Sequence, residues 1–564
     1  MTSVIELYVN RIKNLIEKAI EAAYEKGELP SKEIPSYAVE IPADTNFGDF
    51  AANIAMVGAR SFKTAPRKIA EAIISNIDLK NSGIEKIEIA GPGFINFFVD
   101  MSFFTEILSL VDEKKEEYGR VSIGNGEKLM VEFVSANPTG PMHIGNARGG
   151  ALGDCLASVL DWAGYDVTRE FYVNDAGNQI EKFANSLEAR YMQIFKGEQE
   201  VPFPEDGYHG EDIKVHAAAF ADKYGDKYVE ASLEERKKAL VDYSLPLNIE
   251  KLHTDLAAYR INYDVWFKES SLYEKDAVNK VVKKLTEKGL TYEKEGAIWL
   301  RSTDFGSEKD DVLVRANGFA TYFAADIAYH YNKFIERGFK KVINIWGADH
   351  HGHVARLKGA MEALGVEPDG LDIVLMQLVR LMRGGETVRV SKRTGKSITL
   401  SDLLDEVPVN AARFFFNLRD AGTHLDFDME LAVEESSQNP VYYVQYAHAR
   451  ICSIIANIKK DNRELGTVNA ETLTLLDSSE EKELIRFIGR FPEIIREAAK
   501  SYDPSKITKY AVDLATLFHK FYNARRVNCE ENDLAAARLA LCIATKQVLR
   551  NVSDILKIDA PESM

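Results

Sequence analysis

The chain has 564 residues, which is too many for one hydrophobic core, so we expect roughly three or four domains. Its composition, with 46% hydrophobic and 28% charged residues, is typical of a soluble globular protein, and no apolar run approaches the roughly 18 residues that a membrane-spanning helix needs. The net charge of −17 excludes a broadly basic nucleic-acid-binding coat but is compatible with local basic patches.

Two patterns indicate the cellular compartment. Residues 1–26 are charged throughout and have a helical period, which excludes a secretory signal peptide. The cysteines are widely spaced and form no CxxC pair, which argues against a disulfide framework or a structural zinc site. We therefore expect a cytoplasmic protein. The cysteines are Cys155, Cys452, Cys529 and Cys542.

The first region of the chain has the pattern of a small α+β domain. Residues 1–112 begin with an amphipathic helix and end with "IEKIEIAGPGFINFFV" (84–99), which predicts two short strands around a Gly-Pro-Gly turn. The charged segment 112–120 that follows is typical of a linker.

The second region has the pattern of a parallel sheet. "KLMVEFV" (128–134) predicts a buried strand, 146–164 an amphipathic helix, and "YDVTREFYV" (165–173) the next strand. A second strand–loop–helix unit begins at 340, and we expect one strand over 371–382. Charged helical sequence between these units, about 180–300, predicts a helical insertion into one split α/β domain.

The third region is helical. After Ser437 the chain has long apolar periods of 3.6 residues, which predict an all-α bundle. Residues 441–564 hold 18 Lys and Arg against 17 Asp and Glu, so this bundle is the least repulsive part of the chain for a polyanion. Random variation in surface charge explains that balance equally well.

The loop "VSANPTGPMHIGNARGG" (134–150) is the first candidate site. It joins a strand to a helix through small residues, an arrangement that lets a phosphate approach the free N–H groups of a helix N-terminus. It matches neither GxxxxGK[ST] nor GxGxxG. Gly145 leaves room for an adenine ring, while His143 and Asn146 are candidate donors to phosphate. The alternative is a capped helix with a structural histidine.

The segment "GGETVRVSKRTGKSITLSDLLDEV" (384–407) is the second candidate site. It has no acidic residue between Glu386 and Asp402, whereas a solvated charged face usually mixes signs. A cationic loop of this kind suits a polyphosphate leaving group that gains charge in the transition state. Its basic residues are Arg389, Lys392, Arg393 and Lys396.

These two loops carry a resemblance to a known family. "HIGN" (143–146) resembles the HIGH signature and "RVSKR" (389–393) the KMSKS signature of class I aminoacyl-tRNA synthetases. "VEFVSANPTGPMHIGN", "YVNDAGNQIE", "TYFAADIAYH", "WGADHHGHVARL" and "SKRTGKSITLSDLL" look like bacterial-type arginyl-tRNA synthetases over essentially the whole chain. The chain departs from the signatures where Asn146 replaces the last His and Arg389-Val390 replace Lys-Met.

The resemblance implies an arginine–tRNA ligase of the translation machinery. Such an enzyme forms arginyl-adenylate from L-arginine and MgATP and then transfers arginine to the 3′ end of tRNA(Arg), with tRNA bound before the first step. ATP with Mg²⁺ would be a substrate, with no tightly bound metal or prosthetic group. The partners would be tRNA(Arg), L-arginine and ATP, with no membrane, and the protein would be a monomer.

The resemblance also implies a fold and its division. The fold class is a multidomain α/β protein with a Rossmann-like parallel-sheet (HUP-type) catalytic domain, an N-terminal α+β domain and a C-terminal all-α bundle. Residues 1–112 would contact the tRNA corner, and 113–383 would form the catalytic domain with its insertion at about 180–300. Residues 384–437 would hold the KMSKS-type loop and contact the tRNA stem, and 438–564 would bind the anticodon.

The resemblance implies residue roles that the chemistry allows. The arginine carboxylate is already ionised, so activation needs positioning and charge neutralisation rather than a base. The expected catalytic residues are His143, Asn146 and Lys392. The expected ATP-binding residues are Pro138, His143, Gly145, Asn146, Val390, Ser391, Lys392 and Arg393; a purely loop-structuring role for Arg393 is an equal alternative.

The guanidinium of arginine needs carboxylates and planar acceptors, because it carries five N–H donors and a fixed charge. Tyr322 and Asp326 are spaced i, i+4 on one helical face. Glu132 lies on an apolar strand and therefore needs a partner, either the substrate or a neighbouring cation. The expected arginine-binding residues are Glu132, Ser135, Asn137, His143, Tyr322, Asp326 and Asp349.

The tRNA-binding residues implied by the resemblance are Phe94, Asn96, Tyr446, Arg450 and Arg525. The wider C-terminal candidates are Tyr442, Tyr443, His448 and Arg526, although spacing alone makes most of these tyrosines core residues. Phe94 either stacks on a base or packs internally.

Rival interpretations rest on parts of the same sequence. "DHHGH" (349–353) suggests a metallohydrolase, but adjacent residues on a turning chain do not all face one ion. A small-molecule adenylyltransferase leaves the C-terminal bundle unexplained, and a non-catalytic scaffold leaves His143 and Lys392 unexplained.

Overall fold

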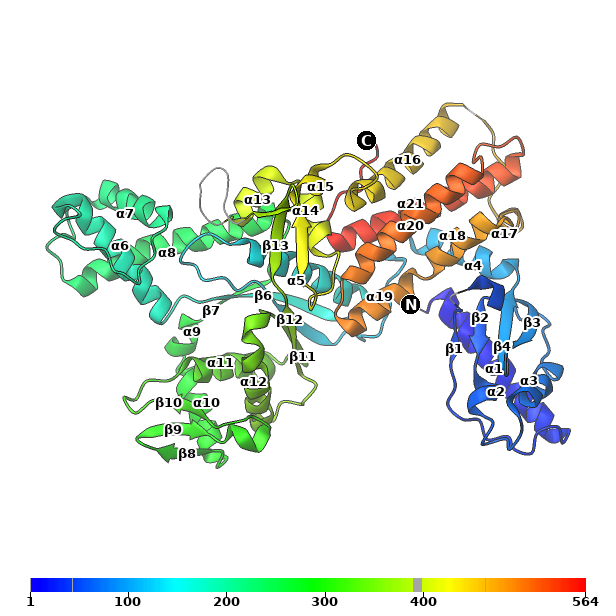
Figure 1. The fold of residues 1–564 in the computed structure, drawn as a ribbon, viewed down its shortest axis with the longest axis horizontal. Coiled ribbons are helices and arrows are strands. Elements are labelled where there is room, and N and C mark those ends of the chain that lie inside the picture. The colour runs from blue at the N-terminus through cyan, green and yellow to red at the C-terminus, as the bar shows by residue number, and fades with distance from the viewer. Residues whose placement is uncertain (1, 43, 389–397, 462) are drawn as a thin grey trace.

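A computed structural model describes residues 2–42, 44–388, 398–461 and 463–564. The N-terminal domain and a helical excursion from the catalytic domain lie at opposite ends of the long axis, with the parallel sheet and the C-terminal helices between them (Figure 1). Among the described residues, no helix combines the length and apolarity that crossing a membrane requires.

The N-terminal domain is an antiparallel sheet with helices packed on it. The strand order is β1-β2-β4-β3, and β3 and β4 meet at the expected turn, where Ala90 pairs with Phe94. Gly91 and Gly93 both have positive φ there, which glycine tolerates best. The elements are α1 Val4–Glu25, β1 Val39–Glu40, β2 Phe50–Ala52, α2 Ile54–Val57, α3 Pro66–Ser75, β3 Ile84–Ala90, β4 Phe94–Val99 and the connecting helix α4 Met101–Lys114.

The catalytic domain is built on a parallel sheet, as the sequence predicts. Its described strands have the order β12-β11-β5-β6-β7. The order reverses between β5 and β11, and ligands of open α/β sheets bind outside the carboxyl ends of the strands at such a switch point. The strands are β5 Lys128–Glu132, β6 Asp166–Val173, β7 Val265–Lys268, β11 Lys341–Gly347 and β12 Leu371–Met376, with helices α5 Ile144–Trp162, α11 Tyr322–Tyr331 and α12 His351–Leu364.

The region expected as one helical insertion differs in the structure, because β7 returns to the main sheet within it. Two excursions result, one helical and one containing a small antiparallel sheet, β10-β9-β8. A four-residue strand flanked by long charged helices is too short to give a periodic signal. The elements are α6 Asn178–Lys196, α7 Glu211–Tyr224 and α8 Leu233–Ala258, then α9 Ser270–Glu274, α10 Ala277–Glu287, β8 Thr291–Lys294, β9 Ala297–Leu300 and β10 Asp311–Val314.

The strand expected over 371–382 is divided in two. Gln377 leaves the parallel ladder: its N–H donates to Ala421 O at 2.9 Å and its carbonyl accepts from Arg148 at 2.6 Å. The chain then enters a second sheet, β14-β13-β15. The elements here are β13 Val379–Arg383, β14 Glu386–Val388, α13 Leu400–Glu406, α14 Val409–Phe416, β15 Leu425–Asp428 and α15 Met429–Val433.

The C-terminal region is the expected helical bundle, and the N-terminal domain docks onto it. Arg486 of the bundle pairs with Asp49 at 2.5 Å, and Asn551 donates to the carbonyls of Lys115 and Tyr118, both at 2.9 Å. The helices are α16 Pro440–Lys460, α17 Ala470–Leu473, α18 Ser479–Gly489, α19 Phe491–Ser501, α20 Ser505–Ala524 and α21 Asn532–Leu556.

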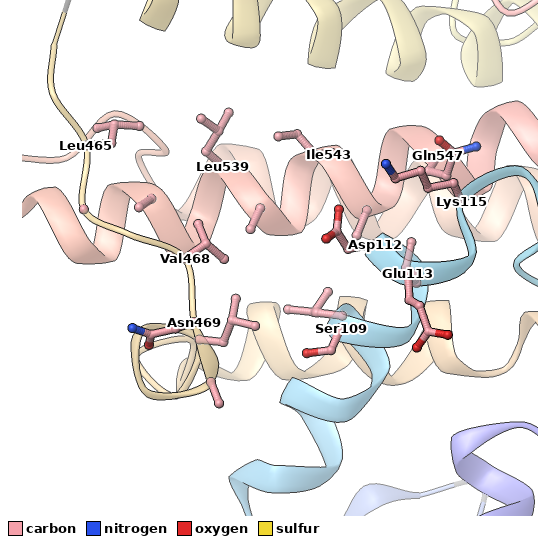
Figure 2. A pocket seen from close by; sticks show the side chains of 18 residues that line it. Ser109, Asp112, Glu113, Lys115, Leu465, Val468, Asn469, Leu539, Ile543 and Gln547 are labelled. Atoms are coloured by element: carbon pink, nitrogen blue, oxygen red, sulfur yellow. The ribbon is translucent and has the colours of Figure 1, made fainter.

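A cavity of about 700 Å³ lies at this junction (Figure 2). α4, the segment before α17 and α21 form its walls, with Val468, Leu539 and Ile543 among the aliphatic side chains that point into it. No strand of the catalytic sheet contributes to the described walls, so this cavity lies apart from the switch point.

Candidate active site at the carboxyl edge of the sheet

The first candidate loop ends at the N-terminus of α5. The backbone N–H of His143 donates to Asn146 Oδ1 at 3.1 Å, so the amide closes the first turn of the helix. The His143 side chain is exposed, and a Cβ on Gly145 would meet no atom within 4 Å. The carbonyl oxygen of Asn146 therefore caps the helix, while no hydrogen bond among the described residues uses its NH₂ group. Pro138 is buried beside this turn.

The described residues after position 397 of the second candidate loop lie beside the first loop. Thr399 pairs with His143 in an antiparallel bridge, and Leu400 N–H donates to Met142 O at 2.9 Å. The predicted ATP-binding residues Val390, Ser391, Lys392 and Arg393 lie outside the described residues. Thr399, in the described chain after these residues, therefore stands directly beside the HIGN turn.

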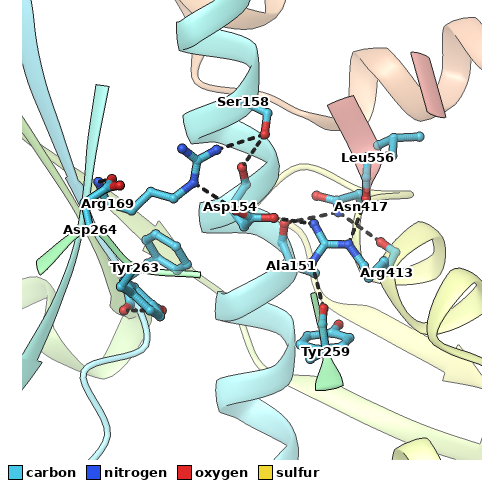
Figure 3. A network of polar contacts seen from close by, with 11 residues as sticks. Ala151, Asp154, Ser158, Arg169, Tyr259, Tyr263, Asp264, Arg413, Asn417 and Leu556 are labelled. Atoms are coloured by element: carbon cyan, nitrogen blue, oxygen red, sulfur yellow. Dashed lines mark hydrogen bonds and ion pairs between the residues drawn. The ribbon is translucent and has the colours of Figure 1, made fainter. Parts of the chain in front are cut away.

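Two buried arginines, Arg148 and Arg413, connect helix α5 to the segments around it, and Figure 3 shows the contacts of Arg413. Arg148 donates to three backbone carbonyls at 2.6–3.0 Å, and burial lowers its pKa. Arg413 donates to Asp154 at 2.6 Å, to Leu556 O at 2.8 Å and to Tyr259 O at 3.0 Å. Arg413 thus ties the HIGN helix to the end of α21 in the C-terminal bundle.

Glu132 has the neighbouring cation that the sequence left as one alternative. It is 7% exposed, and Lys333 Nζ lies 2.5 Å from its Oε2. Ser135 Oγ donates to the other carboxylate oxygen at 3.0 Å and accepts from Tyr172 N–H at 3.1 Å. Glu132 and Ser135 therefore belong to an internal network that fixes the loop after β5.

Tyr322 and Asp326 lie at the start of α11, whose N-cap is Thr321. The Tyr322 hydroxyl accepts from Asn178 N–H at 3.3 Å, which joins α11 to the start of α6. Asp326 Oδ2 lies 2.8 Å from His353 Nε2 of α12, and no hydrogen bond from the described residues reaches Oδ1. The Asp326 side chain is 38% exposed, so one carboxylate oxygen is open to a ligand.

The remaining arginine-site predictions occupy the same edge of the sheet. The Asn137 amide lies 3.2 Å from that of Asn174, in the orientation that satisfies both ends of Asn174. Asp349 follows β11, as expected, and its exposed carboxylate is 3.7 Å from His350 Nε2. His353 faces Asp326 instead, and within the described ranges no three His, Cys, Asp or Glu side chains gather as a metal site would require.

Glu269 is a candidate that the sequence did not reveal. It follows β7 directly and is 4% exposed; Tyr273 OH donates to it at 3.1 Å and the Asn174 amide lies 2.9 Å away. Burial raises the pKa of Glu269, and the nearby charges of Asp326 and Asp175 raise it further. Its signal was its place after a sheet strand, and that strand was too short to recognise.

The predicted RNA-contact residues of the N-terminal domain differ in exposure. Phe94 is 41% exposed at the tip of β4, whereas Asn96 is 3% exposed within the sheet. Of the two, only Phe94 offers its side chain to a base in this structure.

Several of the predicted C-terminal residues share one pocket of about 510 Å³. Tyr442 and Tyr446 stack with centroids 6.4 Å apart, and Arg450 donates to the Tyr446 hydroxyl. His519 and Tyr522 of α20 complete the walls and were not identified from sequence. Burial lowers the pKa of His519, with a further contribution from Arg450. Outside this pocket, Arg525 pairs with Glu480 at 2.9 Å and His448 is buried.

Comparisons with known proteins agree with this geometry. The chain matches three family descriptions: "Arginyl tRNA synthetase N terminal domain" over residues 10–99, "tRNA synthetases class I (R), catalytic domain" over 106–452 and "DALR anticodon binding domain" over 444–564. It is 56% identical over 564 residues to an arginine–tRNA ligase of Caldanaerobacter subterraneus subsp. tengcongensis, covering 100% of both chains. It is 55% identical over 554 residues to that of Ruminiclostridium cellulolyticum, covering 98% of each.

Solved structures are similar as well. A putative arginyl-tRNA synthetase from Campylobacter jejuni aligns with a TM-score of 0.74 at 35% identity, covering 83% of this chain and 100% of that one. The Thermus thermophilus arginyl-tRNA synthetase aligns at 0.72 and 21% identity, covering 97% and 99%, which bears on the fold alone. From the full-length identity and the three matched domains, the chain belongs to the arginyl-tRNA synthetase family of class I aminoacyl-tRNA synthetases.

Proposed function

We propose that this protein activates L-arginine with ATP and transfers it to the 3′ end of tRNA(Arg), in the cytoplasm and as a monomer. The observation that carries the proposal is that Thr399, which follows the second candidate motif, pairs with His143 of the HIGN turn at the switch point of a parallel sheet. Arginine–tRNA ligases that are 56% and 55% identical to this chain, over 100% and 98% of their length, support the choice of amino acid.

In the first step, a carboxylate oxygen of arginine attacks the α-phosphorus of ATP, and the bond to pyrophosphate breaks. Because the nucleophile is already ionised, catalysis is positioning and charge neutralisation. His143 and the NH₂ group of Asn146 donate to phosphate, while Gly145 and Pro138 shape the adenine side. We assign Lys392 to the leaving pyrophosphate, and Val390, Ser391 and Arg393 to ATP binding. Mg²⁺ enters with ATP and is held mainly by phosphates.

The arginine pocket lies between α11 and the loops after β5 and β11. Asp326 and Tyr322 take the guanidinium, with Asp349 at the opposite edge. Asn137 and His143 face the α-amino and carboxylate groups. Glu132 and Ser135 hold the loop in shape, because the Glu132 carboxylate already has Lys333 as its partner.

The tRNA contacts the N-terminal domain, the catalytic domain and the C-terminal bundle. We assign successive parts of the chain to different tasks. Residues 1–112 contact the tRNA corner, 113–383 carry the chemistry, 384–437 contact the stem and 438–564 bind the anticodon. Phe94, with Asn96 behind it, serves the corner, while Tyr446 and Arg450 stack on an unpaired base. Arg525 contributes to the same face. Bound tRNA is required for activation, and the tie between α5 and α21 through Arg413 gives a physical route for that requirement.

ATP–pyrophosphate exchange with each amino acid tests the proposal. Among the amino acids, we expect exchange only with arginine, and only when tRNA(Arg) is present. Exchange with arginine in the absence of tRNA overturns the tRNA requirement, and exchange with a different amino acid overturns the substrate.

Lys392→Ala tests the leaving-group role. We expect the activation rate to fall by about 100-fold or more, with little change in the binding of arginine or tRNA. Lys396→Ala is the matched control, because it removes the same charge from the same loop. Equal loss in both variants, or a loss of binding, contradicts a transition-state role for Lys392.

A further inference from the structure

A hydrogen-bonded chain of four side chains begins at Asp326. His353 Nε2 lies 2.8 Å from Asp326 Oδ2, and Arg356 Nε lies 2.6 Å from His353 Nδ1. Arg356 Nη1 then reaches Asp311 Oδ1 at 3.3 Å. The phenyl ring of Phe323 and the indole of Trp346 enclose the imidazole, with centroids 5.7 and 5.6 Å from it.

These hydrogen bonds fix the protonation state of the His353 imidazole. A guanidinium has only N–H donors and does not lose its proton in proteins, so Arg356 must donate to His353 Nδ1. Nδ1 is therefore an acceptor and carries no hydrogen. The single ring hydrogen lies on Nε2 and points at Asp326. His353 is a neutral donor in this arrangement, although it stands beside a carboxylate that would otherwise favour an imidazolium.

The charged groups around His353 all fit this state. Asp326 on α11 accepts from the ring, and Arg356 on α12 donates to it. Asp311 on β10 holds Arg356 from the far side. His330, also on α11, is neutral, because burial and the charge of Lys333 lower its pKa well below the usual value. β11 contributes the uncharged Trp346.

We propose that His353 and Arg356 are specificity-determining positioning residues that keep Asp326 fully charged and aimed at the guanidinium of the substrate. A neutral donor orients the carboxylate without cancelling its charge, whereas an imidazolium would form an ion pair and compete with the substrate cation. Arg356 prevents that competition by occupying Nδ1. This inference rests on the proposed arginine site and adds the two residues that leave the negative charge of Asp326 available to the substrate.

The test is the pH dependence of the KM for arginine in tRNA(Arg) arginylation, measured from pH 8 to 5.5. In Arg356→Met, Nδ1 of His353 no longer accepts from a guanidinium, so in acid the ring is free to become an imidazolium that pairs with Asp326. We expect the KM, relative to that of the unchanged protein at each pH, to rise about tenfold below pH 6, with kcat changed less than threefold. An unchanged ratio across this range overturns the inference.

A double variant separates this mechanism from a packing defect. Gln offers a donor and an acceptor at opposite ends of its amide but takes up no proton. His353→Gln combined with Arg356→Met therefore removes the extra pH dependence, whereas a packing defect in Arg356→Met persists in the double variant. Retention of the acid rise in the double variant contradicts a role for His353.

If Arg356→Met does not fold, His353→Leu tests the same inference. We expect its KM for arginine at pH 8 to rise about tenfold, the cost of one charge-assisted hydrogen bond, with the KM for ATP unchanged. An unchanged KM for arginine overturns the inference. Absence of arginylation by the unchanged protein contradicts the proposed function instead, and an unaffected Asp326→Asn variant contradicts the arginine site.

Discussion

Glu132 and Asp326 are two carboxylates at the same edge of one sheet, and their surroundings differ. Glu132 is buried and has a lysine of the protein 2.5 Å away. Asp326 is 38% exposed on its side chain and has a neutral histidine as its partner. A carboxylate that already holds an internal cation serves the fold, whereas one that is oriented by a neutral group remains available to a cationic substrate.

The largest effect is expected when the buried pair of Glu132 and Lys333 is broken. Lys333→Met leaves Glu132 buried without a cation, which costs about 3–5 kcal/mol of the free energy of unfolding. Urea denaturation measures this loss. Adding Glu132→Gln to Lys333→Met removes the unpaired charge and restores most of the stability. Equal destabilisation of the single and double variants contradicts the assignment of Glu132 to the fold.

The next largest effect is expected when the partly exposed carboxylate of Asp326 is replaced. Asp326→Asn removes the charge that faces the guanidinium, so we expect the KM for arginine to rise by about 100-fold, equivalent to about 2.7 kcal/mol. Because the Asp326 side chain is partly exposed, the urea midpoint stays close to that of the unchanged protein. A stable variant with an unchanged KM removes Asp326 from the pocket.

Glu269 gives a third, smaller effect, because it is buried like Glu132 but has no cation among its described partners. Because burial raises the pKa of Glu269, its protonated form persists to a higher pH than in a free glutamate, while an arriving guanidinium favours the ionised form. The KM for arginine therefore rises as the pH falls through that pKa, by up to about tenfold. Glu269→Gln abolishes this component of the profile.

Glu269→Gln also has a predictable effect on stability. A carboxyl whose folded pKa lies above its unfolded value destabilises the fold as the pH rises through that interval. The variant is therefore at least as stable as the unchanged protein at pH 7, which thermal melting measures. A lower melting temperature at pH 7 contradicts the account of an unpaired buried carboxylate.

Sequence patterns predict the parts of this molecule that depend on local spacing. The HIGN turn, the parallel strands around it, the Gly-Pro-Gly hairpin and the C-terminal helices all have periodic or motif signals, and they appear in the structure. The i, i+4 pair Tyr322 and Asp326 has such a signal too. β7 was missed because four residues show no period, and the residue after it was missed with it.

Other site features depend on contacts between distant segments. Lys333 reaches Glu132 across 201 positions, and Arg413 reaches Asp154 across 259. His519 and Tyr522 join the tyrosine pocket from a helix whose apolar period alone indicates core packing. A single sequence does not show which buried charged side chains pair with each other. Only the need for a partner, as at Glu132, was therefore predictable.

The most direct measurement compares the KM for arginine in two variants on the same tRNA(Arg) preparation. One variant is Asp326→Asn and the other is Glu132→Gln with Lys333→Met, which removes the internal pair without leaving a buried charge. We predict a rise of about 100-fold in the first and less than threefold in the second. Equal rises in both, or a larger rise in the second, would contradict the division between a carboxylate for the fold and a carboxylate for the substrate.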